Sequence, residues 1–434
     1  MLPQFGLYAR LFVQSLVKDK TFWISWARGL KLVLENRSTW AKPLAQPLVE
    51  KTAFSAYSKD YLFVRVPVIS ADNKPLMPTK PSRARRWIKE GKAIGKFNKL
   101  GIFYVQLTIN PSDTQTQEIV IGLDPGKMFS GVAVQSGKYT LQMLHLVLPF
   151  KTVKDRMEQR SMMRRGRRGR RINRKISFKK RSHRQARFDN RRNSKLPPSI
   201  RANKDLEYRA IKLLSEIYPV KTIVVEELEA RGSKSFSPVM VGQRYQIKRL
   251  SELAKVELRK GWETSNLRKH LGLHKEKSDK SLQVPETHAV DAVTLASSEF
   301  IKYQTWEGTK SHGASWIGTV SITESQFTIL RRPPISRRQL HLMIPSKGGN
   351  RRKYGGTVTR HGFRKGDYVE ATQGSKIFFG WVSGDTDKQV SVSDADWKRL
   401  GQCSVKKVKL LRRSTGLIIK AVKTARVASL SALK

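Results

Sequence analysis

The stretch from Glu118 to Val134 (EIVIGLDPGKMFSGVAV) constrains the fold more than any other part of the chain. An apolar run ends on one acidic residue, Asp124, and the turn-forming pair Pro125-Gly126 follows at once. A second apolar run comes next and Leu141 to Leu148 forms a third, so the pattern predicts a β-meander. Placing a carboxylate at the end of a buried strand is unfavourable unless a cation compensates for its lost hydration. Asp-Pro-Gly is also ordinary turn chemistry, so Asp124 alone leaves both interpretations open.

Two further acidic positions favour a functional site. Lys221 to Val225 (KTIVV) is another apolar run, and it ends on Glu226. In THAVDAVTLA, His288 and Asp291 are three residues apart on a predicted helix, so they share one helix face. Carboxylate oxygens from separate elements are the ligands that Mg²⁺ prefers when it also binds phosphate. Glu227 would point to the opposite side of its strand from Glu226, so it receives no ligand role. For His288, the alternative to a functional role is a histidine that only packs in the core or caps the helix.

The charge of the chain indicates its partner. The 434 residues contain 85 Lys and Arg against 34 Asp and Glu, a formal charge of +51, which predicts a polyanionic partner. The single cysteine, Cys403, excludes a disulfide framework and a multi-cysteine zinc site, and fits a reducing compartment. No run approaches 18 uninterrupted apolar residues, so we expect no membrane span.

The most basic segment runs from Arg160 to Arg192. It holds 13 Arg and 3 Lys against one acid, Asp189, or about +15 in 33 residues. Such a run has no apolar stripe and repels itself unless an anion is bound. Guanidinium groups match phosphate oxygens in pairs, and arginine-rich segments fold on RNA. The alternatives are a nuclear-localisation tract or a disordered tail, but the run lies inside the chain.

Two flanking regions carry weaker signals. Before the meander, the rigid link Pro75 to Pro78 precedes a short helix that we expect to be capped by Ser82 and ended by Gly91, with its cations facing phosphate or simply solvent. After about Phe327, alternating residues between Gly-Asp turns predict short antiparallel strands in a small barrel, whose basic clusters either contact nucleic acid or are solvated. Residues 1 to 60 could be an amphipathic helix, an organelle-targeting segment or an extension from an upstream start codon.

Several motifs in a fixed order resemble one family. PLMP, IGLDPG, the arginine-rich run, RFDNRRNSKLPPS, IVVEE and HAVDA occur in sequence, and RRQLH and NRRKYGGT follow. This order resembles the transposon-encoded IscB and IsrB proteins, with an RRXRR/PLMP-type N-terminal region, over residues 61 to about 420. These proteins are regarded as ancestors of type II CRISPR effector nucleases. The resemblance implies a mixed α/β fold: an RNase H-like RuvC nuclease domain split by an arginine-rich bridge helix, with a small N-terminal PLMP domain and a C-terminal β-barrel-like domain.

The implied domains follow the motifs. They are an N-terminal extension (1–60), the PLMP domain (61–115), RuvC-like part I (116–150), the bridge helix and linker (151–203), RuvC-like parts II and III (204–326) and the basic β domain (327–434). IscB proteins carry an HNH nuclease between the second and third RuvC motifs. Here that interval, Glu227 to Thr287, has 61 residues, only two histidines, and Leu250, Leu253, Ala254 and Leu258 at helical spacing, so the chain is more similar to the RuvC-only IsrB.

The resemblance also implies roles for named residues. Asp124, Glu226 and Asp291 would be the three RuvC carboxylates and hold two Mg²⁺ ions, with Mn²⁺ as a substitute. His288 would orient or deprotonate the attacking water. The predicted nucleic-acid-binding residues are Arg83, Arg85, Arg86, Arg160, Arg164, Arg165, Arg167, Arg168, Arg170, Arg171, Arg174, Arg181, Arg184, Arg187, Arg191, Arg192, Arg337, Arg338, Arg351 and Arg352.

The implied partners are a long structured guide RNA, called ωRNA, and a double-stranded DNA target with a short flanking motif. The strand not paired to the guide would be cut, by a monomer in a ribonucleoprotein with no membrane contact. The expected location is the cytoplasm, close to the nucleoid, with organelle targeting by the N-terminal segment as an alternative. Two other functions stay open: a guide-independent RuvC-like nuclease for branched DNA, and a catalytically silent, basic RNA-binding protein.

Overall fold

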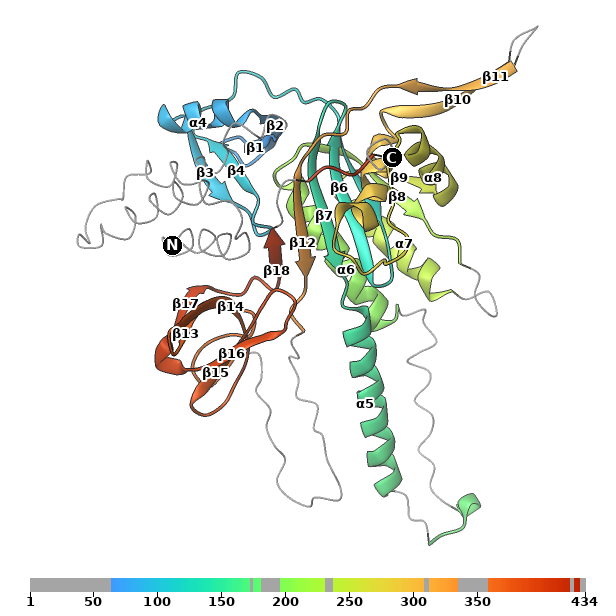
Figure 1. The fold of residues 1–434 in the computed structure, drawn as a ribbon. Helices are drawn as coiled ribbons and strands as arrows, with labels where there is room; N and C mark the ends of the chain where they lie inside the picture. Colours follow the sequence, from blue (N-terminus) through green and yellow to red (C-terminus); the bar gives the residue numbers. More distant parts are fainter. Residues whose placement is uncertain are drawn as a thin grey trace.

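The computed structural model describes residues 64–171, 175–180, 196–230, 237–307, 312–334, 358–421 and 425–429. The predicted extension 1–60 lies outside these residues. So do ten of the predicted nucleic-acid-binding arginines: Arg174, Arg181, Arg184, Arg187, Arg191, Arg192, Arg337, Arg338, Arg351 and Arg352. The described part contains a small N-terminal sheet, a large central sheet, a C-terminal sheet and a two-stranded hairpin (Figure 1).

The N-terminal sheet has the strand order β2-β1-β4-β3 and carries one helix. Its elements are β1 (Val66–Ile69), β2 (Pro75–Thr79), α4 (Pro81–Lys89), β3 (Ala93–Phe97) and β4 (Phe103–Leu107). Helix α4 buries Ala84 and Ile88 and is followed by Gly91, whose φ of 71° ends it as predicted. The predicted Ser82 cap is wrong, because the helix begins with Pro81 at its first position and has no side-chain cap; proline suits this position because its missing N–H needs no partner there.

The central sheet has the order β18-β12-β7-β6-β5-β8-β9. Its strands are β5 (Ile119–Asp124), β6 (Phe129–Ser136), β7 (Thr140–Val147), β8 (Val220–Glu227), β9 (Lys255–Lys260), β12 (Gln326–Arg331) and β18 (Ile418–Ala421). The meander β5-β6-β7 is confirmed, and β8 and β9 are added in parallel on the other side of β5. This arrangement is the RNase H-like sheet that the resemblance implied. Strands β12 and β18 extend it beyond β7, although both belong to the segment after residue 325.

Helices cover both faces of the central sheet. Helix α6 (Pro198–Ser215) packs on one face, and α9 (Val290–Ser297), with the preceding π-helical turn η5 (Pro285–Ala289), packs on the other. Helix α5 (Phe150–Arg171) leaves the sheet after β7 and extends away from it, before the chain reaches α6 and β8 (Figure 1). The arginine-rich helix therefore divides the RNase H-like domain in sequence, as predicted. The short turn η2 (Phe178–Lys180) follows α5.

The interval after β8 contains one clear departure from the prediction. Helix α7 (Pro238–Leu250) and helix α8 (Gly261–His270) are present, but the expected helix through Leu258 is wrong, because Lys255–Lys260 forms strand β9. β9 pairs in parallel with β8, and Val256 and Leu258 pack against the main core. Pairing with a neighbouring strand outweighs local helix propensity here, because a partner far along the chain supplies hydrogen bonds and apolar contact.

The remaining strands form two smaller sheets. Strands β13 (Tyr368–Gln373), β14 (Lys376–Asp385), β15 (Gln389–Ser393), β16 (Arg399–Ser404) and β17 (Val408–Arg412), with the turn η7 (Val405–Lys407), make an antiparallel sheet as predicted, around a core that includes Cys403. Strands β10 (Ile301–Glu307) and β11 (His312–Gly318) form a hairpin after α9. In the described ranges, no helix is long and apolar enough to cross a membrane.

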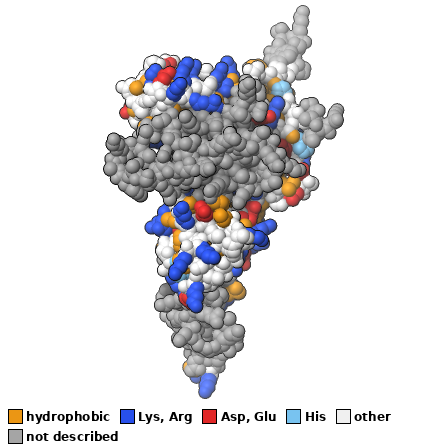
Figure 2. Space-filling view, turned by 60° about the vertical axis from the view of Figure 1, so that its left-hand side comes forward, with side chains coloured by type: hydrophobic (Ala, Val, Ile, Leu, Met, Phe, Trp, Pro, Cys, Tyr) orange, Lys and Arg blue, Asp and Glu red, His pale blue; other side chains and the backbone are white. Residues whose placement is uncertain are grey.

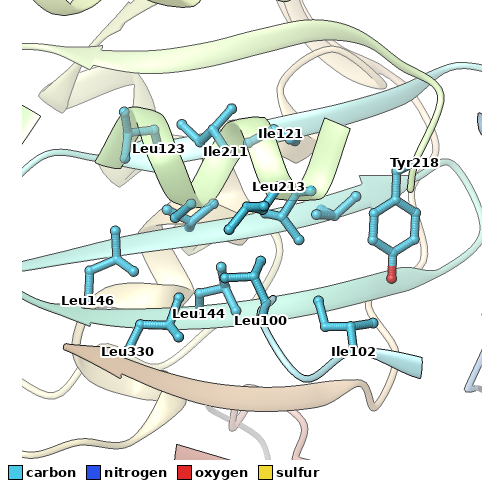
Figure 3. Packing of buried hydrophobic residues seen from close by; sticks show 14 of the residues in the cluster. Leu100, Ile102, Ile121, Leu123, Leu144, Leu146, Ile211, Leu213, Tyr218 and Leu330 are labelled. Atoms are coloured by element: carbon cyan, nitrogen blue, oxygen red, sulfur yellow. The ribbon is translucent and has the colours of Figure 1, made fainter. Parts of the chain in front are cut away.

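The N-terminal sheet is joined to the central core through the loop between β3 and β4. Leu100 and Ile102 of this loop are buried, and Figure 3 shows both side chains among those of β7, β12 and α6. Gly101 has a φ of 75°, a conformation that favours glycine, so the loop can turn between these two side chains. The Asn98 amide donates to the Leu213 carbonyl of α6 at 3.4 Å. Burial of these residues fixes the small sheet against the large one.

Two glycines allow α9 to approach the sheet closely. A Cβ added at Gly122 of β5 would lie 1.9 Å from the Ala292 carbonyl oxygen, and one added at Gly131 of β6 would lie 2.0 Å from the His288 carbonyl oxygen. Both distances are to backbone atoms, which cannot move aside as a flexible side chain could. The position of His288 and Asp291 over the sheet therefore depends on the absence of side chains at these two positions.

We expect Gly122→Ala to destabilise the central domain by about 3 kcal/mol or more, because a methyl group there forces α9 away from the sheet. The midpoint of thermal unfolding measures the loss. The matched control is Gly137→Ala, where the added Cβ would have only ordinary contact with Phe300 at 3.8 Å. A Gly122→Ala variant as stable as the Gly137→Ala variant would contradict the close approach.

Candidate active site

Asp124 and Glu226 lie at the same end of neighbouring parallel strands. Leu123 of β5 is the register partner of Val225 of β8, so the next residue on each strand is one of the two acids. Val224 packs in the cluster with α9, whereas Val225 packs in the cluster with α6. Because side chains alternate along a strand, Glu226 lies on the α9 side and Glu227 on the α6 side. Glu227 is thus placed away from Asp124.

The environment of Glu226 is unfavourable to a charged carboxylate. Burial, and after it the negative charges of Asp124 and Asp291, raise the pKa of Glu226 from 4.5 to about 7. The ammonium group of Lys275 acts in the opposite direction, and a hydrogen bond with Asp124 again favours the protonated form. Since both acids act on Glu226, the structure brings together the three carboxylates that the sequence predicted.

The residue His288 faces Asp124 from the turn η5. Its Nδ1 lies 3.7 Å from Asp124 Oδ2, a separation too long for a direct hydrogen bond. Its Nε2 lies 3.0 Å from the Lys280 carbonyl oxygen. The sequence predicted a regular helix for His288 and Asp291, but His288 belongs to a π-helical turn and Asp291 to the first turn of α9. Both side chains still reach the same site: His288 faces Asp124, whereas Asp291 contacts Arg268 and Lys275.

The third carboxylate is neutralised by two cations. Asp291 is buried, with a side chain only 3% exposed, and its Oδ1 accepts from Arg268 Nη1 at 2.5 Å. Its Oδ2 contacts the Lys275 ammonium group. Arg268 belongs to α8, and Lys275 follows that helix. A buried carboxylate is stable only when paired, so α8 and the segment after it are parts of the site. The sequence analysis missed both residues, since nothing in their local pattern distinguishes them from other surface cations.

The turn after Asp124 is held by a buried polar network. The Gly126 amide donates to Ser130 Oγ at 3.0 Å, and Ser130 donates to Glu207 Oε1 at 2.7 Å. The other oxygen of Glu207 receives Gln246 Nε2 at 2.7 Å and Lys204 Nζ at 3.0 Å. Helices α6 and α7 thereby fix the loop that presents Asp124. The Asp-Pro-Gly segment is a turn as well as the end of a strand that carries a site acid.

A second histidine lies behind His288 and was also missed. His145 of β7 is fully buried, and its ring centroid is 5.3 Å from that of His288 and 5.3 Å from that of Phe129. Neither of its ring nitrogens has a hydrogen-bond partner among the described residues. Burial, and then repulsion by His288 and Arg331, lowers the pKa of His145 to about 3. His145 is therefore neutral, and the only signal in the sequence was a histidine inside an apolar strand.

The donors present suit a hard divalent cation such as Mg²⁺. Asp124 and Glu226 supply carboxylate oxygens in a desolvated position, where their mutual repulsion would be relieved by a cation. As the side chains stand, no group of three or more His, Cys, Asp or Glu in the described ranges is arranged to hold one ion. Within the site, Arg268 and Lys275 contact both oxygens of Asp291. Asp124 and Glu226 have the donor chemistry for a divalent metal, and Asp291 would have to leave Arg268 and Lys275 to join them.

Half of the predicted nucleic-acid-binding arginines lie in described elements. Arg83, Arg85 and Arg86 are exposed on α4, and Figure 2 shows Lys and Arg side chains on the face above the N-terminal sheet. On α5, Arg164 and Arg165 are exposed and Arg160 is half-buried. Arg167, Arg168, Arg170 and Arg171 lie in the last turns of the same helix. Their contact with nucleic acid stays a prediction.

Comparison with known proteins identifies one region of the chain. Residues 66–247 match the family model described as RRXRR protein, which confirms the predicted RRXRR-type region. Thermus thermophilus RuvC in complex with a Holliday junction substrate is similar at 13% identity, covering 42% of this chain and 90% of that one, with a TM-score of 0.24. A second Thermus thermophilus RuvC structure gives 13% identity, 41% and 90% coverage and a TM-score of 0.21. No curated protein matches the chain.

We expect Glu226→Gln to raise the midpoint of thermal unfolding at pH 8 in EDTA. A folded-state pKa raised above the unfolded value contributes stability that is present below pH 4.5 and lost as the pH rises through about 7. The permanently neutral glutamine avoids this loss. The difference in unfolding midpoint between Glu226→Gln and the natural protein should therefore vanish near pH 4.5.

Glu227→Gln is the control, because Glu227 points to the other face of the sheet. It should show no such dependence on pH. If Glu226→Gln unfolds at a lower temperature than the natural protein at pH 8, the three carboxylates do not repel one another as the structure implies.

Proposed function

The chain carries an RRXRR region over residues 66–247, and on that premise we propose that it is an RNA-guided, RuvC-like endodeoxyribonuclease that nicks one DNA strand. The observation that carries the proposal is the convergence of Asp124, Glu226 and Asp291 at one end of an RNase H-like sheet, with His288 beside them. The carboxylates would hold divalent metal, which stabilises the attacking and leaving oxygens during displacement at phosphorus.

The residues of the chain have separable roles in this reaction. In the tautomer in which the Nε2–H of His288 donates a hydrogen bond to the Lys280 carbonyl oxygen, Nδ1 is the acceptor nitrogen, and it faces Asp124. That nitrogen can take a proton from a water molecule held beside Asp124. Phe129 and the neutral His145 pack against the His288 ring and restrict its orientation. Arg268 and Lys275 balance the charge of Asp291, and their cationic groups would suit the phosphate oxygens of a substrate.

The distribution of charge supports nucleic acid as substrate and guide. A net charge of +51 would attract a polyanion, and α5 projects from the central sheet as a basic rod (Figure 1). When base pairing with a guide supplies sequence specificity, the protein only has to grip the backbone and read a short flanking motif. A structured guide RNA on α5 and a double-stranded DNA target fit this division of labour.

The proposal of a single cut rests on the interval between Glu226 and His288. Its described residues form α7, β9 and α8, which belong to the central sheet or pack on it. In an IscB-type arrangement, an HNH nuclease would occupy this interval. One active site cuts one strand, and the strand displaced from the guide is the candidate. A guide-independent nuclease for branched DNA is the second candidate, since the carboxylate cluster by itself would serve both.

We expect Asp124→Ala to lower the rate of Mg²⁺-dependent nicking at least a thousandfold, while leaving the affinity for RNA unchanged. The carboxylate acts only at the reacting phosphate, whereas RNA would bind to distant arginines. Nicking of supercoiled plasmid, assayed with the protein and its copurified RNA, measures the first effect, and a gel-shift assay measures the second.

Glu227→Ala is the matched control and should nick normally, because Glu227 points away from the site. Mg²⁺ should also raise the unfolding midpoint of the natural protein but not of Asp124→Ala. Nicking by Asp124→Ala at the natural rate would remove Asp124 from the mechanism, and efficient double-strand breaks by the natural protein would contradict a single active site.

We also expect one long, discrete RNA to copurify with the protein from its host, since guidance requires a defined partner. Sequencing of the bound RNA tests this. Random fragments alone would contradict guidance and favour the guide-independent nuclease.

A further inference from the structure

A groove of about 760 Å³ lies beside the candidate active site, between α8 and the β10–β11 hairpin. Aromatic and cationic side chains gather in it. Those on which the inference depends are Trp262, Lys269, His270, Tyr303 and Trp316. None of them has a role in the carboxylate cluster, so the groove calls for a separate explanation.

Two of the aromatic side chains that line the groove, Trp262 and Tyr303, are largely exposed. Trp262 is 62% exposed and Tyr303 59% exposed. The rings of His270 and Trp316 are stacked, with centroids 4.7 Å apart and an angle of 14° between their planes. Tyr303 meets Trp316 edge to face at 5.1 Å. Large aromatic surfaces left in water are unfavourable and mark a site that a ligand covers.

The polar groups of the groove favour an anionic ligand. In the described part of the chain, Lys269, which lines the groove, forms no ion pair. The acid that lines the groove, Glu263, is occupied, because its carboxylate accepts the Lys260 backbone N–H at 2.6 Å at the start of α8. Rings beside a free cation match unpaired nucleotides, since bases stack on the rings while a phosphate approaches the cation.

Helix α8 connects the groove directly to the carboxylates. Its first residue, Gly261, lies so close to Glu226 that an added Cβ would be 2.8 Å from Glu226 Oε1. Farther along the same helix, Arg268 holds Asp291, while Trp262 and His270 of this helix line the groove. The helix has ten residues and is about 15 Å long. A strand in the groove would thus be only a few nucleotides from the site of cleavage.

We propose that this groove is a stacking platform for unpaired nucleotides of the DNA strand that is cut. The proposal rests on the proposed nuclease function and adds the path of the substrate to it. The platform would hold bases on Trp262, Tyr303 and Trp316 and would align the adjoining phosphate with Asp124 and Glu226. Ordering of a flexible single strand in this way would favour cleavage of unpaired over paired DNA.

The test measures stacking rather than charge, because basic surfaces elsewhere also bind DNA. A single-stranded oligonucleotide that contains 5-iododeoxyuridine is bound to the full-length protein in EDTA and irradiated, and cross-linked peptides are identified. We expect cross-links on Trp262, Tyr303 or Trp316. Fluorescence anisotropy should show that Trp262→Ala with Tyr303→Ala weakens binding of a 20-nucleotide single strand about tenfold, with less than a twofold effect on a duplex of equal length.

Ile317→Ala is the matched control, because Ile317 is exposed on β11 but points to the opposite face of the hairpin from Trp316. It should bind the single strand normally. Trp262→Phe should retain most of the affinity, since a ring remains. Unchanged single-strand binding and cross-links confined to other peptides would overturn the proposal, and so would a tenfold loss seen for single-stranded RNA but not for DNA.

Binding in EDTA requires no cleavage, so the two proposals fail separately. If the natural protein never nicks DNA but the double variant loses single-strand binding, the groove stands and the nuclease assignment falls. The natural protein could instead nick DNA while the double variant shows the same single-strand affinity and the same nicking rate. In that case the nuclease assignment stands and the groove is not its substrate path.

Discussion

Mutual repulsion among three carboxylates is the constraint on which the rest of this structure depends. Asp124 and Glu226 close adjacent buried strands, and Asp291 faces them from α9. Burial, together with the negative charges of Asp124 and Asp291, raises the pKa of Glu226 to about 7. Such a cluster persists only if the surroundings fix it and supply opposite charge. Arg268 and Lys275 neutralise Asp291, so the counter-charges come from α8 and the segment that follows it.

Close backbone packing positions the cluster. Gly122 and Gly131 let η5 and α9 rest directly on β5 and β6, which places His288 over Asp124. On the opposite face of the sheet, Glu207 ties α6 and α7 to the loop after Asp124 through Ser130. The site is thus assembled from both layers of helices, and a change in the packing of either layer would move a site residue.

Under the two proposals, different elements of the exterior would carry two kinds of recognition. Helix α5 and the exposed face of α4 present arginines, which suit phosphate without regard to base. The groove next to α8 presents rings, which suit bases without regard to sequence. Under the proposed function, a guide RNA would supply the sequence information by pairing. The aromatic groove and the carboxylates share helix α8, which contributes residues to both.

The sequence by itself determined the parts that depend on local pattern. Strands β5, β6, β7 and β8 follow from apolar periodicity, and Asp124 and Glu226 were identifiable because each interrupts such a run at its end. The position of the arginine-rich helix between the two parts of the sheet also followed from order along the chain. Tertiary structure alone decided the rest. Strand β9 forms because β8 lies beside it, and the helical spacing of its residues gave the opposite expectation. Arg268, Lys275, His145 and the groove acquire roles only through neighbours distant in sequence, because charge pairing, burial and ring stacking act over a few ångströms in space and leave no period in the chain.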